Sequence, residues 1–437
     1  MTRREAGAVL GVLGILVAVT VPELGSDPWP FARIRADAEG VLGPLVRAAD
    51  GEWDLGLLRA AAVLAGLVVA LCAAVVLWVR VVPRRLVWLV CAAVILLLTV
   101  PATLLQVGLR DATHPWYHVN DSTYQIDLAG ELVLDGDTPY GYDYRGTGLE
   151  RWYPAVDADE DVPRVALDHF AYFPGTALTA AAWRLIPAPF DDYRIFVLLC
   201  TLALFAAALL FDAPLPWKLA AGAALAANPL ATRAAWFGTA DAPSVLLTVL
   251  AFAFVARSRY LLAAASLGGA VLLKQFALVA VPFLVVAMLS RAVPRPLLYR
   301  AAAVFALVVV VGILPFAIAD PGALWEDTIA YGAQTYRIIG YGLAGILVET
   351  GVLDDRFGSY PFLPLAILVW LPVTAWLVWT QWRQRRLWVG AAGFASSIFV
   401  LFYLGRVFQN SYLIWPLSAL LVAFVLASAE RDPSERS

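Results

Sequence analysis

Asp121 is a carboxylate whose position in this sequence suits proton transfer. It lies in the run His114-Pro-Trp-Tyr-His-Val-Asn-Asp-Ser-Thr-Tyr124, directly after an apolar segment that ends near Val107. A partly desolvated carboxylate binds a proton more readily than one in bulk water, which is what a general base at neutral pH requires. The same residue fits a helix N-cap, because the residues that follow resemble a first helical turn. The sequence leaves both roles open.

Lys274 is a lysine within an apolar run. It lies in Ala270-Val-Leu-Leu-Lys-Gln-Phe-Ala-Leu-Val-Ala-Val-Pro282, and it is one of only two lysines in the chain. An ammonium among apolar residues is costly unless it is paired or solvated. An anionic phosphate is the partner that we favour. Snorkelling of the side chain to the interface is the alternative, and a carboxylate such as Asp241 is another possible partner.

Further polar residues lie in segments between apolar runs, Arg406 in a short one and Arg337 in the longer region 319–360. Arg337 and Arg406 suit bidentate contacts to a phosphate, although either arginine suits an ion pair with a loop acid as well. Asn410 and Tyr412 follow Arg406 in the same short segment.

Asn228-Pro229 and Asp241 flank a predicted hairpin. This hairpin would bring Asp241 toward the segment around Asp121 and so place two acids together. An ordinary turn in which Asp241 caps the next helix is the alternative.

No metal site is expected. His114 and His118 are four residues apart, with Asp121 three residues further on, but Pro115 argues against one helix that would place them on a common face. We therefore favour histidines at a wet interface. The acidic run 155–168 predicts a solvated loop, with calcium binding as a minor alternative.

The composition predicts the elements that position these residues. The chain has 437 residues, of which 61% are apolar and 15% charged, whereas soluble domains have near 45–50% and about 25%. Apolar segments of roughly 17–25 residues recur, as membrane-spanning helices require. We predict an all-α polytopic membrane protein with about 12–13 transmembrane helices. The thirteen segments are 6–22, 57–79, 86–108, 172–187, 194–211, 218–236, 242–256, 260–273, 275–290, 300–319, 361–380, 387–405 and 411–428.

Arginines predict the orientation. Putting the arginine-rich short loops in the cytoplasm places 23–56, 109–171, 228–241, 319–360 and 406–410 outside. This orientation needs two crossings between 171 and 228, where three segments lie. The short segment 172–187 is then a partial or re-entrant helix, or a loop. We also expect an amphipathic interfacial helix at 31–49, with a short linker helix as the alternative, and an interfacial helix pair within 322–352.

The loop 109–171 carries a charge balance of −9, from thirteen Asp or Glu and four Arg. No basic face suggests nucleic acid.

In their order and spacing, these residues resemble the GT-C glycosyltransferases, and in particular the polyprenyl-phosphate-mannose-dependent mannosyltransferases of glycosyltransferase family 87. The matching positions are Asp121, Tyr124, Gly136 and Tyr140, then Tyr172-Phe-Pro174, then Asn228-Pro229 with Gly238, and then Leu273-Lys274. The sequence departs from the family pattern at Gln275, where the family has proline, and at Thr239-Ala240-Asp241, where Gln-x-Asn is expected. The two leading spans, 6–22 and 57–79, also depart from it.

The resemblance implies a GT-C-like bundle with a large extracytoplasmic loop, divided into an N-terminal part (1–85), a core (86–290) and a C-terminal part (291–437). It implies inverting transfer of a hexose from a polyprenyl-phosphate donor to an acceptor hydroxyl on a glycan, glycolipid or protein. No cofactor is expected; a divalent metal is the alternative, which nothing in the sequence supports. Asp121 would be the base, and Lys274, Arg337 and Arg406 would bind the donor phosphate. The residues expected around donor and acceptor are Tyr124, Asp127, Tyr172, Asn228, Asp241, Asn410 and Tyr412.

Two other functions compete with the enzyme. A transporter or flippase for a lipid-linked glycan explains the spans and the intramembrane lysine, but it does not explain a long acidic and aromatic external loop. A non-catalytic scaffold is the third possible function.

Overall fold

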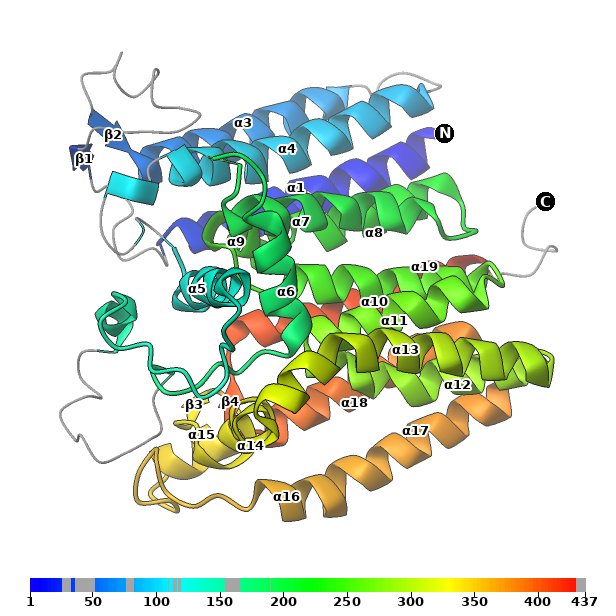
Figure 1. Ribbon diagram of the computed structural model, residues 1–437. Helices are drawn as coiled ribbons and strands as arrows, with labels where there is room; N and C mark the ends of the chain where they lie inside the picture. The colour runs from blue at the N-terminus through cyan, green and yellow to red at the C-terminus, as the bar shows by residue number, and fades with distance from the viewer. Residues whose placement is uncertain are drawn as a thin grey trace. The chain divides into compact units, whose positions relative to one another are not determined.

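The computed structural model describes residues 1–25, 33–35, 52–75, 82–108, 110–112, 116, 119–153, 166–188 and 190–429 (Figure 1). Their regular structure is helical apart from two pairs of strands of two or three residues. Five helices are long and apolar enough to cross a membrane, namely Arg84–Gly108, Arg295–Ala319, Phe362–Gln384, Leu387–Leu404 and Asn410–Ala429. The chain is an all-α polytopic membrane protein, as its composition predicts.

Each of the thirteen predicted apolar segments overlaps a helix. Five further apolar stretches of helix among the described residues have 10–17 residues. The total of about 12–13 crossings therefore stays a prediction.

Contacts within the chain divide it into two compact units. Unit 1 comprises Met1–Thr123, Trp183–Ala242 and Phe424–Ser437, and unit 2 comprises Tyr124–Ala182 and Pro243–Ala423. Each unit combines segments that are far apart in the sequence. The family resemblance divides the chain differently, at residues 85 and 290, according to where the motifs lie. That division stays a prediction.

Unit 1 is built mainly from long apolar helices. Helix α1 packs on α3 and α8, and α4 packs on α3, α7 and α9 (Figure 1). The strands β1 and β2 form an antiparallel pair. The elements are α1 (Arg3–Gly25), β1 (Arg33–Arg35), β2 (Glu52–Asp54), α3 (Leu55–Val75), α4 (Arg84–Gly108), η2 (Arg110–Ala112), α7 (Tyr193–Leu209), α8 (Leu215–Ala227) and α9 (Pro229–Phe237).

Asn228 and Pro229 interrupt the predicted segment 218–236. Proline lacks an N–H and is tolerated in the first turn of a helix. The Asn228 side chain accepts a hydrogen bond from the Ala231 N–H at 3.0 Å and so caps α9. One apolar segment thus becomes two helices, α8 and α9.

Unit 2 contains most of the remaining elements, although the ends of α5, α6, α10 and α19 belong to unit 1. Helix α11 packs on α13, and α12 packs on α17 and α18. The elements are α5 (Asp121–Asp135), η3 (Leu149–Trp152), α6 (Pro174–Trp183), α10 (Asp241–Ala256), α11 (Tyr260–Leu273), η4 (Gln275–Ala280), α12 (Val281–Ser290), α13 (Arg295–Ala319), α14 (Pro321–Trp325), η5 (Glu326–Thr335), β3 (Ile339–Gly340), α15 (Leu343–Glu349), α16 (Phe362–Leu365), η6 (Ala366–Trp370), α17 (Leu371–Gln384), α18 (Leu387–Leu404), β4 (Val407–Phe408), η7 (Asn410–Leu413) and α19 (Ile414–Ala429).

Helix α6 is the short element expected within 172–187. It has 10 residues, and at 1.5 Å per residue it is about 15 Å long, roughly half the hydrocarbon thickness of a bilayer. It is therefore too short to span by itself.

The region 322–352 contains short helices, as predicted: α14, the π-helix η5 and α15. The amphipathic helix expected at 31–49 is wrong for Arg33–Arg35, which form strand β1 because they pair with β2. The other residues of that range lie outside the described part of the chain.

Helix α17 exposes most of its side chains and is attached to unit 2 through polar groups. Thr374 and Gln381 are its buried residues. The Thr374 and Ser397 hydroxyls are 2.7 Å apart, and the Gln381 amide donates to the Phe283 carbonyl at 2.9 Å. In the preceding turn, the Trp370 indole donates to the Ser397 carbonyl at 3.1 Å. The exposed apolar side chains of α17 suit contact with lipid.

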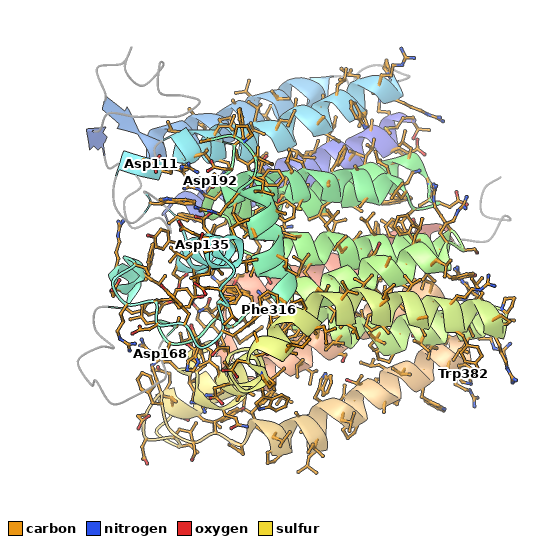
Figure 2. All side chains as sticks on the ribbon, in the orientation of Figure 1. Asp111, Asp135, Asp168, Asp192, Phe316 and Trp382 are labelled. Carbon is orange, nitrogen blue, oxygen red and sulfur yellow. The ribbon has the colours of Figure 1, made fainter. Side chains whose placement is uncertain are left out.

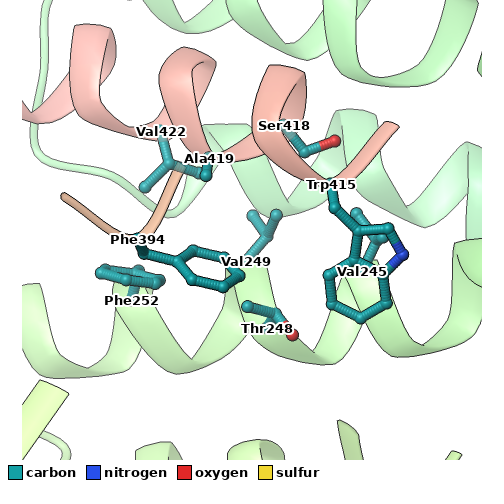
Figure 3. Close-up of a pocket in the computed structure, with 9 residues that line it drawn as sticks. All are labelled: Val245, Thr248, Val249, Phe252, Phe394, Trp415, Ser418, Ala419 and Val422. Carbon is teal, nitrogen blue, oxygen red and sulfur yellow. The ribbon is translucent and has the colours of Figure 1, made fainter. Parts of the chain in front are cut away.

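A small apolar pocket lies between α10, α18 and α19 of unit 2, bordered by Phe252, Phe394 and Trp415 (Figure 3). Its polar lining residues are Thr248 and Ser418. Because it lacks a charged side chain, we do not assign it to an anionic group.

Candidate active site

The start of α5 is anchored in unit 1 by a chain of buried hydrogen bonds. The Trp236 indole donates to the Leu98 carbonyl at 2.8 Å, and the Thr103 hydroxyl donates to the Ala235 carbonyl at 2.8 Å. These bonds hold α9 against α4. The residues after Trp236 in turn hold the segment that carries Asp121.

Residues 120–123 contact the end of α9. The Asn120 N–H donates to the Phe237 carbonyl at 3.3 Å, and the Thr123 hydroxyl donates to the Gly238 carbonyl. The Asn120 side chain accepts from the Ser122 N–H at 3.0 Å, so Asn120 caps α5. Asp121 is half-buried, and its carboxylate also accepts from the Ser122 N–H, at 2.8 Å. A neighbour therefore supplies a capping acceptor, and α5 does not depend on Asp121 alone for its cap.

Gly238 makes this close approach possible. Its φ is +76°, in the left-handed region that favours glycine, and a Cβ there would lie 2.5 Å from Arg194 Cγ and 2.9 Å from Thr123 Cγ2. Arg194 forms a fully buried ion pair with Asp192, with Nη2 2.7 Å from Oδ2. Gly238 thus fits between Arg194, which its ion pair holds in place, and the first turn of α5.

Asp241 begins α10, three residues after Gly238, and it is 4% exposed. The contact between residues 120–123 and 237–238 therefore holds the backbone that precedes Asp241 against the segment that carries Asp121. Asn228 interrupts α8 and caps α9, as described above, which gives it a structural role.

Lys274 lies where the apolar run turns from α11 into η4. Its backbone is extended, with φ −154° and ψ 124°. The Thr176 hydroxyl of α6 donates to the Leu273 carbonyl at 2.6 Å, and a Cβ on Gly175 would lie 2.7 Å from the Leu272 backbone. The short helix α6 is therefore packed directly against the backbone that precedes Lys274.

Aromatic rings surround the ammonium of Lys274. Its Nζ lies 5.7 Å from the ring centre of Tyr172, 5.4 Å from that of Phe276 and 5.5 Å from that of Tyr412. The residue is 7% exposed. Ring faces attract cations, by about 2 kcal/mol or more at desolvated sites. The rings therefore stabilise a charged lysine at this buried position.

His169 and Asp327 form a buried pair in unit 2. His169 Nδ1 lies 2.8 Å from Asp327 Oδ1, and the other carboxylate oxygen accepts from the N–H groups of Gly141 at 2.9 Å and Phe170 at 3.2 Å. The imidazole stacks on Tyr331, with ring centres 4.2 Å apart. The segment that carries His169 is thereby attached to η5.

A second hydrogen bond links this pair to the lysine. The Gln275 amide donates to the Thr328 carbonyl at 3.1 Å, and these residues follow Lys274 and Asp327 directly. Tyr172, which contacts the ammonium, lies three residues after His169. Lys274 and the His169–Asp327 pair are therefore neighbours at the same end of unit 2. Asp168 lies at this end, and Trp382 lies at the opposite end (Figure 2).

Arg406 is 2% exposed, and it holds backbone segments in place. Its Nε donates to the Tyr336 carbonyl at 2.7 Å, and Nη1 donates to the Gly358 carbonyl at 3.1 Å. Strand β4 begins directly after Arg406, and it pairs in parallel with β3. Among the described residues, no partner accepts a hydrogen bond from the buried Nε of Arg337.

Tyr124 and Asp127 lie on α5 and are both buried, at 4% exposure. The Tyr124 hydroxyl donates to the Thr147 carbonyl at 2.7 Å. Burial raises the pKa of the Tyr124 phenol above its ordinary value, and the negative charges of Asp127 and Glu131 act in the same direction. Asn410 is exposed at the start of η7, and Tyr412 is half-buried.

No group of three or more His, Cys, Asp or Glu side chains in the described part of the chain is arranged to hold a metal ion. His114 and His118 lie outside that part.

His169 and Asp327 were not among the residues predicted for the site. They are 158 positions apart, so a single sequence gives no sign of their pairing. The nearest signal is the position of His169 just before the Tyr172-Phe-Pro motif.

Comparison with known proteins gives no matching family model and no matching curated protein. Two solved structures are similar. ArnT from Cupriavidus metallidurans bound to undecaprenyl phosphate has 19% sequence identity and a TM-score of 0.47, over 79% of this chain and 61% of that protein. The apo form of the same protein has 18% identity and a TM-score of 0.47, over 81% and 62%. This chain thus spans about three fifths of the length of the structures it matches.

Proposed function

We propose that this chain is an integral-membrane glycosyltransferase that moves a sugar from a polyprenyl-phosphate donor to an acceptor hydroxyl at the extracytoplasmic face. The observation that carries the proposal is the position of Lys274. A buried ammonium lies at the turn between two apolar helices, ringed by Tyr172, Phe276 and Tyr412. The apolar tail of a lipid phosphate lies among apolar helices, so its charged phosphate lies near the ends of such helices. Lys274 lies at such an end.

The donor phosphate is bound by Lys274, with Arg337 and Arg406 as further cationic groups. The buried Nε of Arg337 has no acceptor among the described residues, which suits a ligand that supplies one. Arg406 already donates to two carbonyls, so its main contribution is to hold the segment next to Arg337. The cations stabilise the charge that grows on the phosphate in the transition state.

Asp121 is the base in this proposal. It accepts the proton of the acceptor hydroxyl while the hydroxyl oxygen forms a bond to the anomeric carbon. The bond from that carbon to the phosphate oxygen breaks, and its electron pair leaves with the lipid phosphate. Because attack is in line, the anomeric configuration inverts. The capping acceptor supplied by Asn120 supports this role, since α5 has a cap without the Asp121 carboxylate.

The donor sugar is mannose or another hexose, and the acceptor is a glycan, a glycolipid or a protein. The residues proposed to lie around them are Tyr124, Asp127, Tyr172, Asn228, Asp241, Asn410 and Tyr412. The resemblance to glycosyltransferase family 87 supports the choice of hexose.

The active site is proposed to face the outside of the cell membrane. The polar end of unit 2, marked by Asp168, lies opposite the end that carries Trp382 and Arg383 (Figure 2). Arginine-rich ends favour the cytoplasm, which leaves the Lys274 end outside.

Purified protein in lipid nanodiscs tests the proposal. Polyprenyl-phosphate mannose and the corresponding glucose donor are supplied with short mannoside acceptors, and the release of polyprenyl phosphate and the anomeric configuration of the product are measured. Inverted product that requires Asp121 supports the enzyme. No transfer, together with movement of a lipid-linked glycan across proteoliposomes, would establish the transporter instead.

A further inference from the structure

Three short turns of unit 2 carry a dense group of arginines. The turns join α10 to α11, α12 to α13 and α17 to α18, and each has two to four residues. A non-glycine residue with left-handed backbone lies in each turn, with φ of 57° at Ser258, 53° at Ala292 and 55° at Arg385. Turns this short keep their side chains close to the helix ends. We call the group the arginine end, and its members are Arg257, Arg259, Arg291, Arg295, Arg300, Arg383, Arg385 and Arg386.

The three turns lie at one level of unit 2. The ring of Phe252 on α10 stacks on that of Phe394 on α18, with centres 6.1 Å apart. A Cβ on Gly393 of α18 would lie 2.6 Å from the ring of Phe283 on α12. From these contacts each helix continues for five to eight residues before its turn, which is roughly 8–12 Å at 1.5 Å per residue. Figure 1 likewise shows the turn after α12 and the end of α17 at the same end.

Positive charge at the arginine end is not balanced by the helices that form it. All eight arginines are exposed. The sequence has no Asp or Glu in 242–319 or in 357–429, the stretches that supply these helices. Arg291 donates to the Val255 carbonyl at the end of α10, which joins two of the turns but neutralises no charge. A surface with one sign of charge attracts ligands of the opposite sign, so an anionic partner fits here.

Aromatic side chains place the arginine end at the surface of a bilayer. Trp376, Trp379 and Trp382 of α17 are exposed, and so is Tyr299 near the start of α13. The guanidinium of Arg383 lies 5.5 Å from the ring centre of Trp379. Tryptophan and tyrosine concentrate at the level of lipid headgroups, because their rings are amphipathic. The arginines beside these rings therefore lie at the level of lipid phosphates.

We propose that the arginine end is a binding surface for anionic phospholipids. Guanidinium groups bind phosphate oxygens through two parallel hydrogen bonds. The acyl chains of such a lipid lie against α13 and α17, whose most apolar windows are only 17% and 6% buried. A soluble acidic protein would satisfy the arginines but has no use for exposed apolar helices, which favours lipid. The surface goes beyond the proposed function, because it contains none of the residues assigned to the donor or the acceptor.

The tail 430–437 is the competing occupant, and it lies outside the described part of the chain. It holds three acidic residues and two arginines, a net charge of −1. This charge is too small to balance eight arginines. A general preference of basic segments for one side of the membrane is the other explanation, and it predicts no selection among lipids.

Spin-labelled lipids test the proposal. The full chain is placed in phosphatidylcholine vesicles with a trace of spin-labelled phosphatidylglycerol or spin-labelled phosphatidylcholine, and the immobilised fraction of each label is measured. The wild type should prefer phosphatidylglycerol by at least about fivefold, which corresponds to the attraction of one basic residue to anionic lipid. The triple substitution Arg383→Gln, Arg385→Gln and Arg386→Gln should reduce this preference by at least about half.

Arg151→Gln is the matched control. Arg151 is exposed in the same unit, and its guanidinium also lies over a tryptophan, 5.9 Å from the ring centre of Trp152. It belongs to a different segment and has Glu150 beside it, so this variant should retain the preference. The triple substitution to lysine retains the charge that orients the chain, and it should fall between the wild type and the glutamine variant because lysine lacks the paired donors of arginine.

Each contrary result has its own meaning. Equal immobilisation of the two lipids by the wild type overturns the proposal, and this comparison stands even if the variants do not insert. An equal preference in the triple glutamine variant and the wild type overturns it as well. Loss of the preference in 10 mM inorganic phosphate would make the surface a site for free anions. Release of the labelled lipid by poly-glutamate would indicate an acidic protein, and a several-fold gain on deletion of 430–437 would make the tail the occupant; both results overturn the assignment to lipid.

Discussion

The hydroxyl of Thr176 donates to the carbonyl of Leu273 at 2.6 Å, across 97 residues of sequence. The C-terminal carbonyls of a helix have no partner within that helix, and here a residue of α6 supplies one. Helix α6 thus holds the backbone just before Lys274 in position. This short helix and the turn from α11 into η4 form one structural element of the candidate site.

Lys274→Met should abolish binding of polyprenyl phosphate without destabilising the empty protein, because methionine fits among Tyr172, Phe276 and Tyr412 without a charge to stabilise. Melting temperatures with and without polyprenyl phosphate check this expectation. Lower stability of the empty variant would indicate a carboxylate partner such as Asp241, because removing one member of a buried pair strands the other charge. Unchanged stabilisation by the lipid would exclude Lys274 from the site.

Asp121→Asn should lower the turnover number by about 10²–10⁴, the usual contribution of a general base, and leave the melting temperature close to that of the wild type. Asn120→Ala is the matched comparison, since it removes the capping acceptor and should cost about 1 kcal/mol of stability. Sugar-transfer kinetics and thermal melts measure both effects. Near-normal turnover of Asp121→Asn would leave Asp121 with a structural role only.

Gly238→Ala should destabilise the protein by more than the ~1–2 kcal/mol that a left-handed backbone costs alanine, because its Cβ meets Arg194 and Thr123. Gly136→Ala separates the two effects: Gly136 has φ +86° but no atom within 4 Å of a Cβ. Chemical unfolding in detergent compares the two variants. Equal losses of stability would show that the close approach at Gly238 is unimportant.

Stability should fall as the pH rises from about 10 to about 12. Burial raises the pKa of Tyr360 to about 12, above the value of about 10 in an unfolded chain. The folded state therefore holds the proton more tightly, and this contribution is complete below pH 10 and is lost as the pH rises through 12. Unfolding measured against pH should show a shallower alkaline decline in Tyr360→Phe, and an unchanged slope would contradict the assignment.

Asp135→Cys tests the orientation, since Asp135 is exposed at the end of α5. In a background with the native cysteines replaced, a membrane-impermeant thiol reagent should label it in intact cells. Gln384→Cys, exposed at the end of α17, should react only after the cells are opened. The reverse pattern would overturn the extracytoplasmic site.

Single residues show how far the sequence predicted this structure. The break at Lys274 separates 260–273 from 275–290, and the structure has α11 and α12 with a 3-10 turn between them. Both helices are visible in the sequence because a long apolar run contains a charge. The break at Asn228 carries a local signal too, an asparagine before a proline.

What the sequence did not predict depends on contacts over long distances. Asp121 fitted an N-cap, but the capping acceptor found is on Asn120, one residue earlier. His169 and Asp327 meet only through tertiary structure, and the donation of Thr176 to Leu273 does the same. Arg406, expected at a phosphate, donates to the carbonyls of Tyr336 and Gly358. Which carbonyls lie near this side chain depends on the path of the folded backbone.

The polar contacts of α17 determine its rotation about its own axis. Lipid tails are as apolar as leucine, so apolar side chains give a transmembrane helix little preference for one face over another. Trp370, Thr374 and Gln381 lie at intervals of four and seven residues, on one side of the helix, and each forms a hydrogen bond to unit 2. Rotating the helix by a quarter turn about its axis would place these polar groups in hydrocarbon without hydrogen-bond partners. The side chains of α17 that face lipid can therefore vary among apolar residues. Trp370, Thr374 and Gln381 determine which side of the helix faces the rest of unit 2.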